Sequence, residues 1–247
     1  LKNTADYLGD AQTYAEVRDS NADNRHLADA SLSTVISYEK EIEKREAAKQ
    51  IDKIKILTAA ERKDRPLNPQ PLPEIRQDLV YASDRFLTLL PEHERAPAIA
   101  YRAAETFYHY DQLDEARARF ERIVVRYPSN EVASYNANLI IESYMAVEDW
   151  DNVEKWSQQL MDATAKGGGS AADQAAQRAF ADQLKDFKVG ARFKKAEQLN
   201  AAGDYEQAAE TYVKLVDESP DHEFADKALF NAAIAFEKVK RFDSASK

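Results

Sequence analysis

The chain has 247 residues, and its 34 lysines and arginines against 44 aspartates and glutamates give a formal net charge of −10. This acidic balance argues against a nucleic-acid binder, which would carry a basic stripe. The absence of cysteine excludes disulfides, thiolate catalysis and zinc–cysteine or iron–sulfur sites. With 44% hydrophobic residues but only 6 glycines and 8 prolines, the composition predicts a folded chain of long helices. No apolar run approaches the ~18 residues that cross a bilayer.

The first 63 residues predict an irregular helical region. Apolar residues recur at helical spacing over residues 1–19. From about Asn24 to Lys63 there is neither proline nor glycine, which predicts one unusually long helix, or two continuous ones, of about 35–40 residues. Its second half is densely charged with both signs. We interpret it as a solvated helix with pairs such as Glu41–Arg45; a coiled-coil or partner-docking helix is the alternative.

Residues 64–73 hold four of the eight prolines and predict an extended, semi-rigid linker before a helix that begins near Glu74. The stretch from Pro66 to Pro69 has the form of a PxxP ligand. A spacer between two helical regions is the simpler interpretation, and we adopt it here.

Two segments, residues 97–128 and 189–220, share one pattern: an apolar residue in a turn, then alanine, then an aromatic residue, then an aliphatic one, then proline. The matching positions are Leu113, Ala116, Phe120, Ile123 and Pro128 in the first segment, and Tyr205, Ala208, Tyr212, Leu215 and Pro220 in the second. Degenerate copies place Trp150 and Val153, and then Phe242 and Ala245, at the first two positions. Counted from Pro97, Ser134, Val189 and Asp226, the copies are offset by 37, 55 and 37 residues. Small residues let two helices approach closely, and the second apolar face of each pair must be buried against a neighbour.

The pattern predicts helix pairs over residues 74–166 and 171–247, joined by a flexible glycine-rich connection at residues 167–170. That connection lacks the lysine and hydroxyl residue of a phosphate-binding loop. The last repeat breaks off within its second helix, so we expect both ends of the sequence to be cuts through a longer protein.

No constellation of residues predicts catalysis. The four histidines, at positions 26, 93, 109 and 222, are scattered, and none forms a metal-binding pair on a helix. His222 with Glu223 and Asp226 is the one weak metal candidate, for which we prefer helix capping. There is no nucleophile elbow, dinucleotide fingerprint or Walker motif. We therefore expect no enzymatic activity, no cofactor and no metal.

These repeats resemble the tetratricopeptide repeat, a helix–turn–helix unit of about 34 residues. The resemblance implies an all-α fold, an α-α superhelix of antiparallel helix pairs. The 37-residue spacing, with Pro220-Asp221 followed by an alanine-rich helix, resembles the bacterial envelope branch of the family, its outer-membrane assembly lipoproteins and Tol–Pal accessory proteins. That implies a periplasmic or outer-membrane-associated scaffold in envelope assembly, division or motility. Alternatives are a cytosolic adaptor or regulator that binds a peptide, and a solenoid arm of a larger enzyme.

The resemblance also implies a concave groove lined by the first helix of each pair. Carried over residue by residue, the groove positions include Tyr101, Glu105, Tyr108, Asn138, Glu142, Phe193, Glu197 and Phe230. The repeated glutamates would repel a carboxylate, so the resemblance implies a protein partner with a neutral or basic segment that carries apolar side chains. Self-association is a further expectation, because Phe230, Ile234 and Phe236 lie beside the incomplete last helix.

Overall fold

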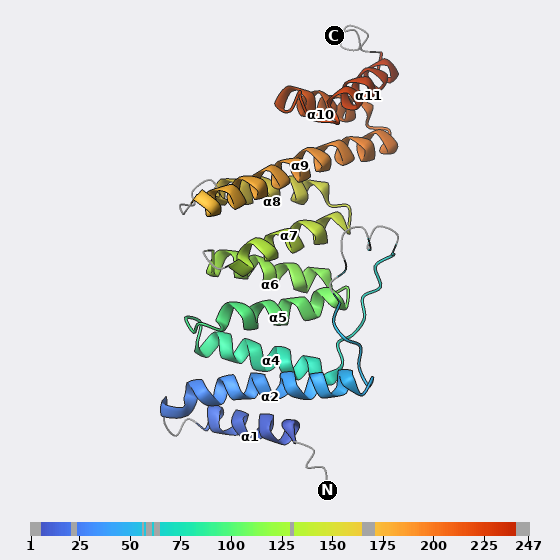
Figure 1. Cartoon of the computed structure of the whole chain (residues 1–247). Helices are drawn as coiled ribbons and strands as arrows, with labels where there is room; N and C mark the ends of the chain where they lie inside the picture. Colours follow the sequence, from blue (N-terminus) through green and yellow to red (C-terminus); the bar gives the residue numbers. More distant parts are fainter. Residues whose placement is uncertain are drawn as a thin grey trace. The chain divides into compact units, whose positions relative to one another are not determined.

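The computed structural model (Figure 1) describes residues 6–20, 24–55, 57, 61, 65–128, 131–164 and 171–240. The chain divides into two compact units. Unit 1 comprises Leu1–Ile140. Its helices are α1 (Tyr7–Asp19), the short 3-10 helix η1 (Asn24–His26), α2 (Leu27–Ala47), α4 (Glu74–Leu89), α5 (Ala96–His109), α6 (Leu113–Arg126) and most of α7 (Glu131–Met145). Consecutive helices from α1 to α6 pack side by side.

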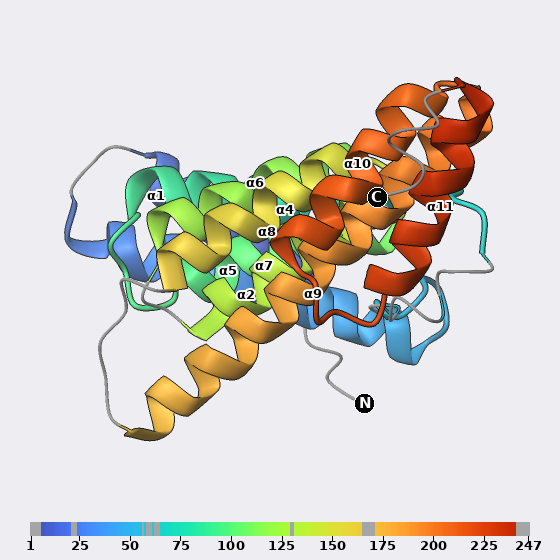
Figure 2. The same ribbon diagram turned by 90° about the horizontal axis from the view of Figure 1, so that it is seen from above.

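Unit 2 comprises Ile141–Lys247 and contains the end of α7. Its further helices are α8 (Trp150–Thr164), α9 (Ala171–Ala202), α10 (Tyr205–Glu218) and α11 (Ala225–Lys238). From α8 to α11 each helix packs on the next. α9 is 32 residues long, and its amino-terminal part runs out beyond the α10–α11 pair (Figure 2).

Every regular element in the described ranges is helical, which confirms the predicted all-α fold of helix pairs packed in series. None of the described helices combines the length and the apolar character needed to cross a bilayer. The predicted glycine connection at residues 167–170 and the turn copy at Phe242 lie outside the described residues.

Small residues lie where the helices cross, as predicted. Ala104, Ala116, Ala196 and Ala208 are all fully buried. Phe120, four residues after Ala116 on the same helix, is also fully buried, and burial of its side chain contributes about 2–3 kcal/mol to stability.

The turns between paired helices are built alike. The turns that follow α2, α5, α7 and α9 each contain one residue in the left-handed backbone region, namely Lys49, Asp111, Glu148 and Gly203, and Lys240 takes the same conformation after α11, with φ between 55° and 86°. In four of these turns the next residue donates its N–H to a carbonyl five residues back: Gln50 to Arg45, Gln112 to Phe107, Asp149 to Tyr144 and Asp204 to Leu199, at 2.9–3.0 Å. This is the arrangement that satisfies the free carbonyls at a helix end. The last four left-handed residues are 37, 55 and 37 residues apart, the offsets of the sequence repeat.

The second helices of three pairs also end alike. Leu90, Tyr127 and Ser219 cap α4, α6 and α10 with φ between −147° and −126° and ψ between 52° and 62°, and each precedes a proline. α2 and α4 therefore form a helix pair of the same build as α5–α6. Forty-two residues separate Lys49 from Pro91, against seventeen from Asp111 to Pro128, so this pair carries an insertion of 25 residues in its turn.

The prediction of a helix as far as Lys63 is wrong, because α2 ends at Ala47. Arg76 on α4 explains the end: its guanidinium binds the Glu46 carboxylate at 2.7 Å and the Asp52 carbonyl at 2.6 Å, which requires the chain to turn between them. The predicted Glu41–Arg45 pair is present at 2.9 Å, but Glu41 is buried rather than solvated.

Candidate protein-binding site

In unit 1 the predicted groove residues lie on α5 and α7. Tyr101 and Glu105 are half-buried on α5. Tyr108 is fully buried, with its ring edge-on to Phe120 at a centroid distance of 6.0 Å. Tyr108 therefore holds the α5–α6 pair together and offers no surface to a partner.

Tyr101 forms the centre of a polar and aromatic cluster. Its hydroxyl lies 3.3 Å from Oε1 of Glu105 and donates a hydrogen bond to it. Its ring packs edge-on against Tyr135 of α7 at 5.5 Å, and Tyr135 is itself 46% exposed. Burial and the Glu105 charge raise the pKa of Tyr101, so the hydroxyl stays a donor at neutral pH.

Two carboxylates from different helices share the positive charge of Arg102, and through this arginine Glu39 of α2 is linked to the cluster. Burial raises the pKa of Glu105 on α5 and of Glu39 on α2, and the positive charge of Arg102 opposes the shift at both. Nε of Arg102 lies 3.6 Å from Oε1 of Glu39, and the arginine side chain is about half exposed. A cation placed nearby stabilises the ionised form of a half-buried carboxylate, so this face favours a positively charged ligand group.

The predicted groove residues did not include Glu39 or Tyr135: Glu39 lies before the recognised repeats, and Tyr135 directly follows the start of the copy counted from Ser134. Asn138 on α7 is half-buried, and within the described residues its Oδ1 has no hydrogen-bond partner. Glu142 is half-buried beyond Ile140, on the part of α7 that belongs to unit 2.

In unit 2 the predicted residues differ in environment. Phe193 is buried, stacked on Phe224 at 5.0 Å and edge-on to Tyr212 at 5.4 Å. Phe230 on α11 is 66% exposed and, together with the exposed Leu229 and Ile234, forms an apolar patch. Phe193 thus packs between helices, whereas Phe230 presents its ring to solvent.

Glu197 is neutralised within unit 2. Its carboxylate oxygens lie 2.7 Å from Nζ of Lys194 and 3.8 Å from Nζ of Lys227, which also sits 4.8 Å from the centroid of the Phe193 ring. Glu197 should therefore repel a carboxylate less strongly than the sequence implied. Among the predicted groove glutamates, Glu105 is the better candidate for such repulsion.

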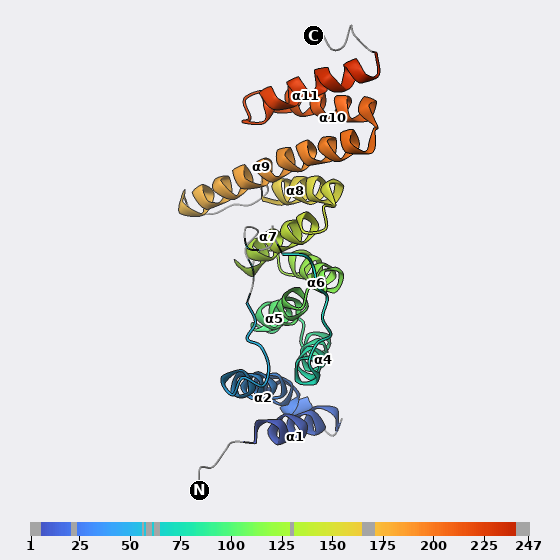
Figure 3. The ribbon, with the colours of Figure 1, turned by 90° about the vertical axis from the view of Figure 1, so that its right-hand side faces the viewer.

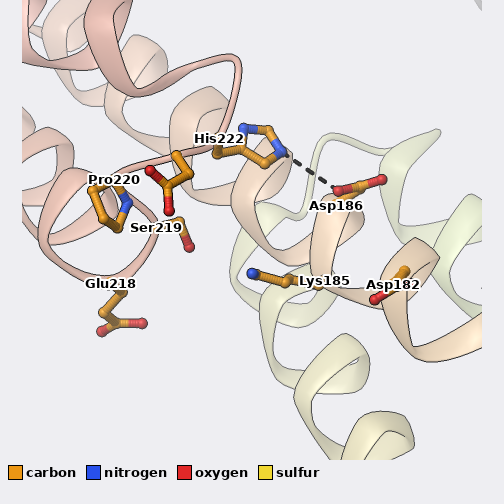
Figure 4. A pocket seen from close by; sticks show the side chains of 8 residues that line it. Asp182, Lys185, Asp186, Glu218, Ser219, Pro220 and His222 are labelled. Atoms are coloured by element: carbon orange, nitrogen blue, oxygen red, sulfur yellow. Dashed lines mark ion pairs between the residues drawn. The ribbon is translucent and has the colours of Figure 1, made fainter. Parts of the chain in front are cut away.

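A cavity of about 440 Å³ lies between α9 and the α10–α11 connection (Figure 4). His222 reaches across it, with Nε2 3.6 Å from Oδ1 of Asp186. The other ring nitrogen, Nδ1, accepts the N–H of Phe224 at 3.2 Å, which is a capping contact ahead of α11. No group of histidines, aspartates or glutamates suited to a metal ion occurs among the described residues. The contacts of His222 are thus those of a residue that stabilises the turn before α11.

Comparison with known families agrees with this architecture. Residues 98–130 and 191–222 match the family model of the tetratricopeptide repeat. The first stretch covers most of α5 and all of α6, and the second covers the last part of α9 and all of α10. No curated protein matches the chain, and no catalytic family was detected. The chain therefore contains tetratricopeptide repeats in these two stretches, and such repeats are helix pairs that serve protein–protein interaction.

Proposed function

We propose that this protein is a non-catalytic scaffold and that the cluster of Glu39, Tyr101, Glu105 and Tyr135 in unit 1 contacts its partner. The observation that carries the proposal is the contact of the half-buried Glu105 with Tyr101, whose ring packs on the exposed Tyr135, while Arg102 next to Glu39 links a second half-buried carboxylate to this face. A lysine or arginine on the partner would stabilise the negative charge of these glutamates, which burial has partly removed from water. Apolar side chains beside that cation would pack on the tyrosine rings. The partner segment is accordingly neutral or basic, with apolar side chains.

A charge series of twelve-residue peptides with equal apolar content tests this proposal. We expect binding to weaken from net charge +3 through zero to −3. Glu105→Lys should weaken binding of the basic peptide by at least tenfold, since it places a cation inside the cluster. Glu115→Lys is the matched control, because Glu115 is exposed on α6 and carries the same charge. Equal losses in both variants, or preference for the acidic peptide, would overturn the assignment.

We further propose that the scaffold works in a bacterial cell-envelope complex, periplasmic or attached to the outer membrane. The 37-residue spacing and the Pro220-Asp221 turn before an alanine-rich helix support this placement. Fractionation of cells that express the protein from its natural gene provides the test. Recovery in the periplasmic or membrane fraction is expected, whereas recovery in the cytosol alone would favour a cytosolic peptide-binding adaptor.

A further inference from the structure

Described residues of the insertion in the α2–α4 turn lie against the next helix pair. The chain leaves α2, passes the carboxyl end of α5 and returns along the α5–α6 turn to α4 (Figure 3). On the outward path the backbone N–H of Lys55 donates to Nδ1 of His109 at 3.0 Å. On the return path, residues 65–72 follow the turn closely.

Contacts between residues 65–72 and the turn run through the backbone. The N–H of Asn68 donates to Oδ2 of Asp111 at 3.1 Å, and the N–H of Gln70 donates to the carbonyl of Tyr110 at 2.9 Å. Nε2 of Gln112 returns a hydrogen bond to the Gln70 carbonyl at 2.7 Å. Donors two residues apart that face one surface are typical of an extended segment laid along its receptor.

The side chains at either end of the segment add to these contacts. Arg65 reaches Oδ2 of Asp111 at 3.3 Å, and Leu72 is buried among Val80, Ala103, Phe107 and Tyr110. The spacing of the prolines fits this arrangement. Pro69 and Pro71, which have no N–H, alternate with the two residues whose N–H groups are used. Prolines also stiffen the segment and reduce the entropy lost when it is held.

Asp111 distinguishes this turn from its counterparts. Glu148, Gly203 and Lys240 occupy the same left-handed position in later turns, but Asp111 is buried and its carboxylate binds a segment 43–46 residues away in sequence. A buried carboxylate is costly unless donors meet it, and residues 65–68 supply two. The turn is thus equipped to hold an extended chain.

We propose that the α5–α6 turn is a docking site for an extended proline-rich segment, and that residues 65–72 of the same chain occupy it as an internal ligand. An external segment that binds there must offer N–H donors two residues apart, with prolines between them and a basic residue near its start. It competes with the internal ligand for the turn. The site uses residues other than Glu39 and Glu105, so it stands or fails separately from the proposed partner cluster.

A variant with an empty turn tests the proposal directly. The carbonyl of Asp52 accepts a hydrogen bond from Arg76, and Arg76 lies four residues after Leu72. Asp52 and Leu72 are therefore close enough for a short linker to join them. Residues 53–71 are replaced by eight glycines and serines, which span roughly 16 Å as a flexible coil. The probe is a capped peptide of residues 65–71, titrated while the amide resonances of residues 110–113 are followed by NMR. Circular dichroism and the thermal midpoint confirm that the variant remains folded.

We expect the shortened variant to bind the peptide with saturation in the low millimolar range or better, and the intact chain to bind it at least tenfold more weakly, because its site is filled at a high effective concentration. A peptide of equal composition, in which each of the last two prolines is exchanged with the residue before it, should not bind. Absence of binding to the folded shortened variant, or equal binding of both peptides, would overturn the proposal.

Hydrogen exchange in the intact chain gives a second measurement. Asp111→Gly keeps a left-handed backbone that glycine adopts readily and removes only the carboxylate. We expect it to speed exchange of the Asn68 amide at least tenfold. Glu148→Gly makes the same change in the equivalent turn, and should leave that amide unaffected. An unchanged Asn68 rate in Asp111→Gly would show that the carboxylate does not hold the segment.

Discussion

Arg119 on α6 binds both carboxylate oxygens of Asp84 on α4, with nitrogen–oxygen distances of 2.7 and 2.9 Å. The same guanidinium lies 4.7 Å from the centroid of the Phe107 ring on α5. One largely buried side chain thus links three helices of unit 1 and ties α4 to the pair that follows it.

Arg119→Ala is predicted to lower the free energy of unfolding by about 1–2 kcal/mol, since it removes a bidentate ion pair and a cation–π contact together. Asp84→Ala should cost less, about 0.5 kcal/mol, because the carboxylate is half exposed and the ring contact survives. Urea unfolding measures both. Arg122→Ala, on the exposed side of the same helix, is the control, and a loss as large as that of Arg119→Ala would refute the three-helix role.

The ionisation of Asp19 should contribute to the dependence of stability on pH at acid pH. Hydrogen bonds from Arg18, and secondarily from Arg85, lower its pKa from 3.8 to about 2. A lowered carboxylate pKa stabilises the fold above the unfolded pKa, and this stabilisation is lost as pH falls from about 4 through about 2. Because Asp19 is partly exposed, solvent screening reduces the contribution to about 1 kcal/mol.

Asp19→Asn should therefore be less stable than the parent chain at pH 7, and the difference should shrink toward zero near pH 2. Guanidinium unfolding at pH 7, 4 and 2 checks this trend. A difference that stays constant over this range would mean that the charge of Asp19 does not contribute.

Glu105 should show the opposite sign. Burial raises the pKa of this carboxyl, so its ionisation at neutral pH costs stability. Glu105→Gln keeps an acceptor for the Tyr101 hydroxyl and is predicted to stabilise the fold at pH 7 by about 0.5 kcal/mol. The gain should disappear at acid pH, where the glutamate is already protonated.

The same variant should lose affinity for the basic peptide, so stability and binding move in opposite directions. Thermal denaturation and peptide titration of one sample measure both. Loss of stability together with loss of binding would instead indicate that Glu105 is only a structural residue.

The repeats could be predicted from sequence because their signal is local. Within one pair the pattern predicts close helix packing at Ala116, a buried ring at Phe120 and the end of the helix before Pro128. The structure confirms each of these roles. The fold class follows from such pairs, since each leaves an apolar face that a neighbour must cover.

What the sequence missed is non-local. The α2–α4 pair was overlooked because 25 inserted residues separate its two helices, although the run from Pro91 to Ala96 resembles that from Pro220 to Ala225. A position in the family pattern also does not distinguish a groove residue from a core residue. Tyr108 occupies a predicted groove position but is buried, with its ring packed against Phe120 from the second helix of its pair. Glu39 of α2 is linked to Glu105 of α5 only through Arg102 of α5, a contact between residues 63 positions apart in sequence.

The two histidine turns provide a further prediction. Nδ1 of His93 accepts the N–H of Arg95 at 3.1 Å, and Nδ1 of His222 accepts that of Phe224 at 3.2 Å, so the two imidazoles play one role before α5 and α11. Replacing either by alanine should cost about 0.5–1.5 kcal/mol, the usual loss for a helix-start acceptor. His26→Ala is the control, because His26 makes no cap hydrogen bond. If all three changes cost the same in urea unfolding, the capping role is refuted.

The apolar patch of α11 bears on self-association. Leu229, Phe230 and Ile234 of this one helix are all exposed, and several exposed apolar side chains on one helix favour contact between chains at high concentration. Phe230→Ser with Ile234→Ser should leave the thermal midpoint nearly unchanged, because exposed side chains contribute little to folding. Sedimentation velocity from 10 to 500 µM should show less association for this double variant than for the parent chain. The control is Val125→Ser, which removes a single exposed apolar side chain from α6. If the parent chain stays monomeric throughout that range, the patch does not drive self-association, and if it associates but the double variant associates equally, the contact lies elsewhere.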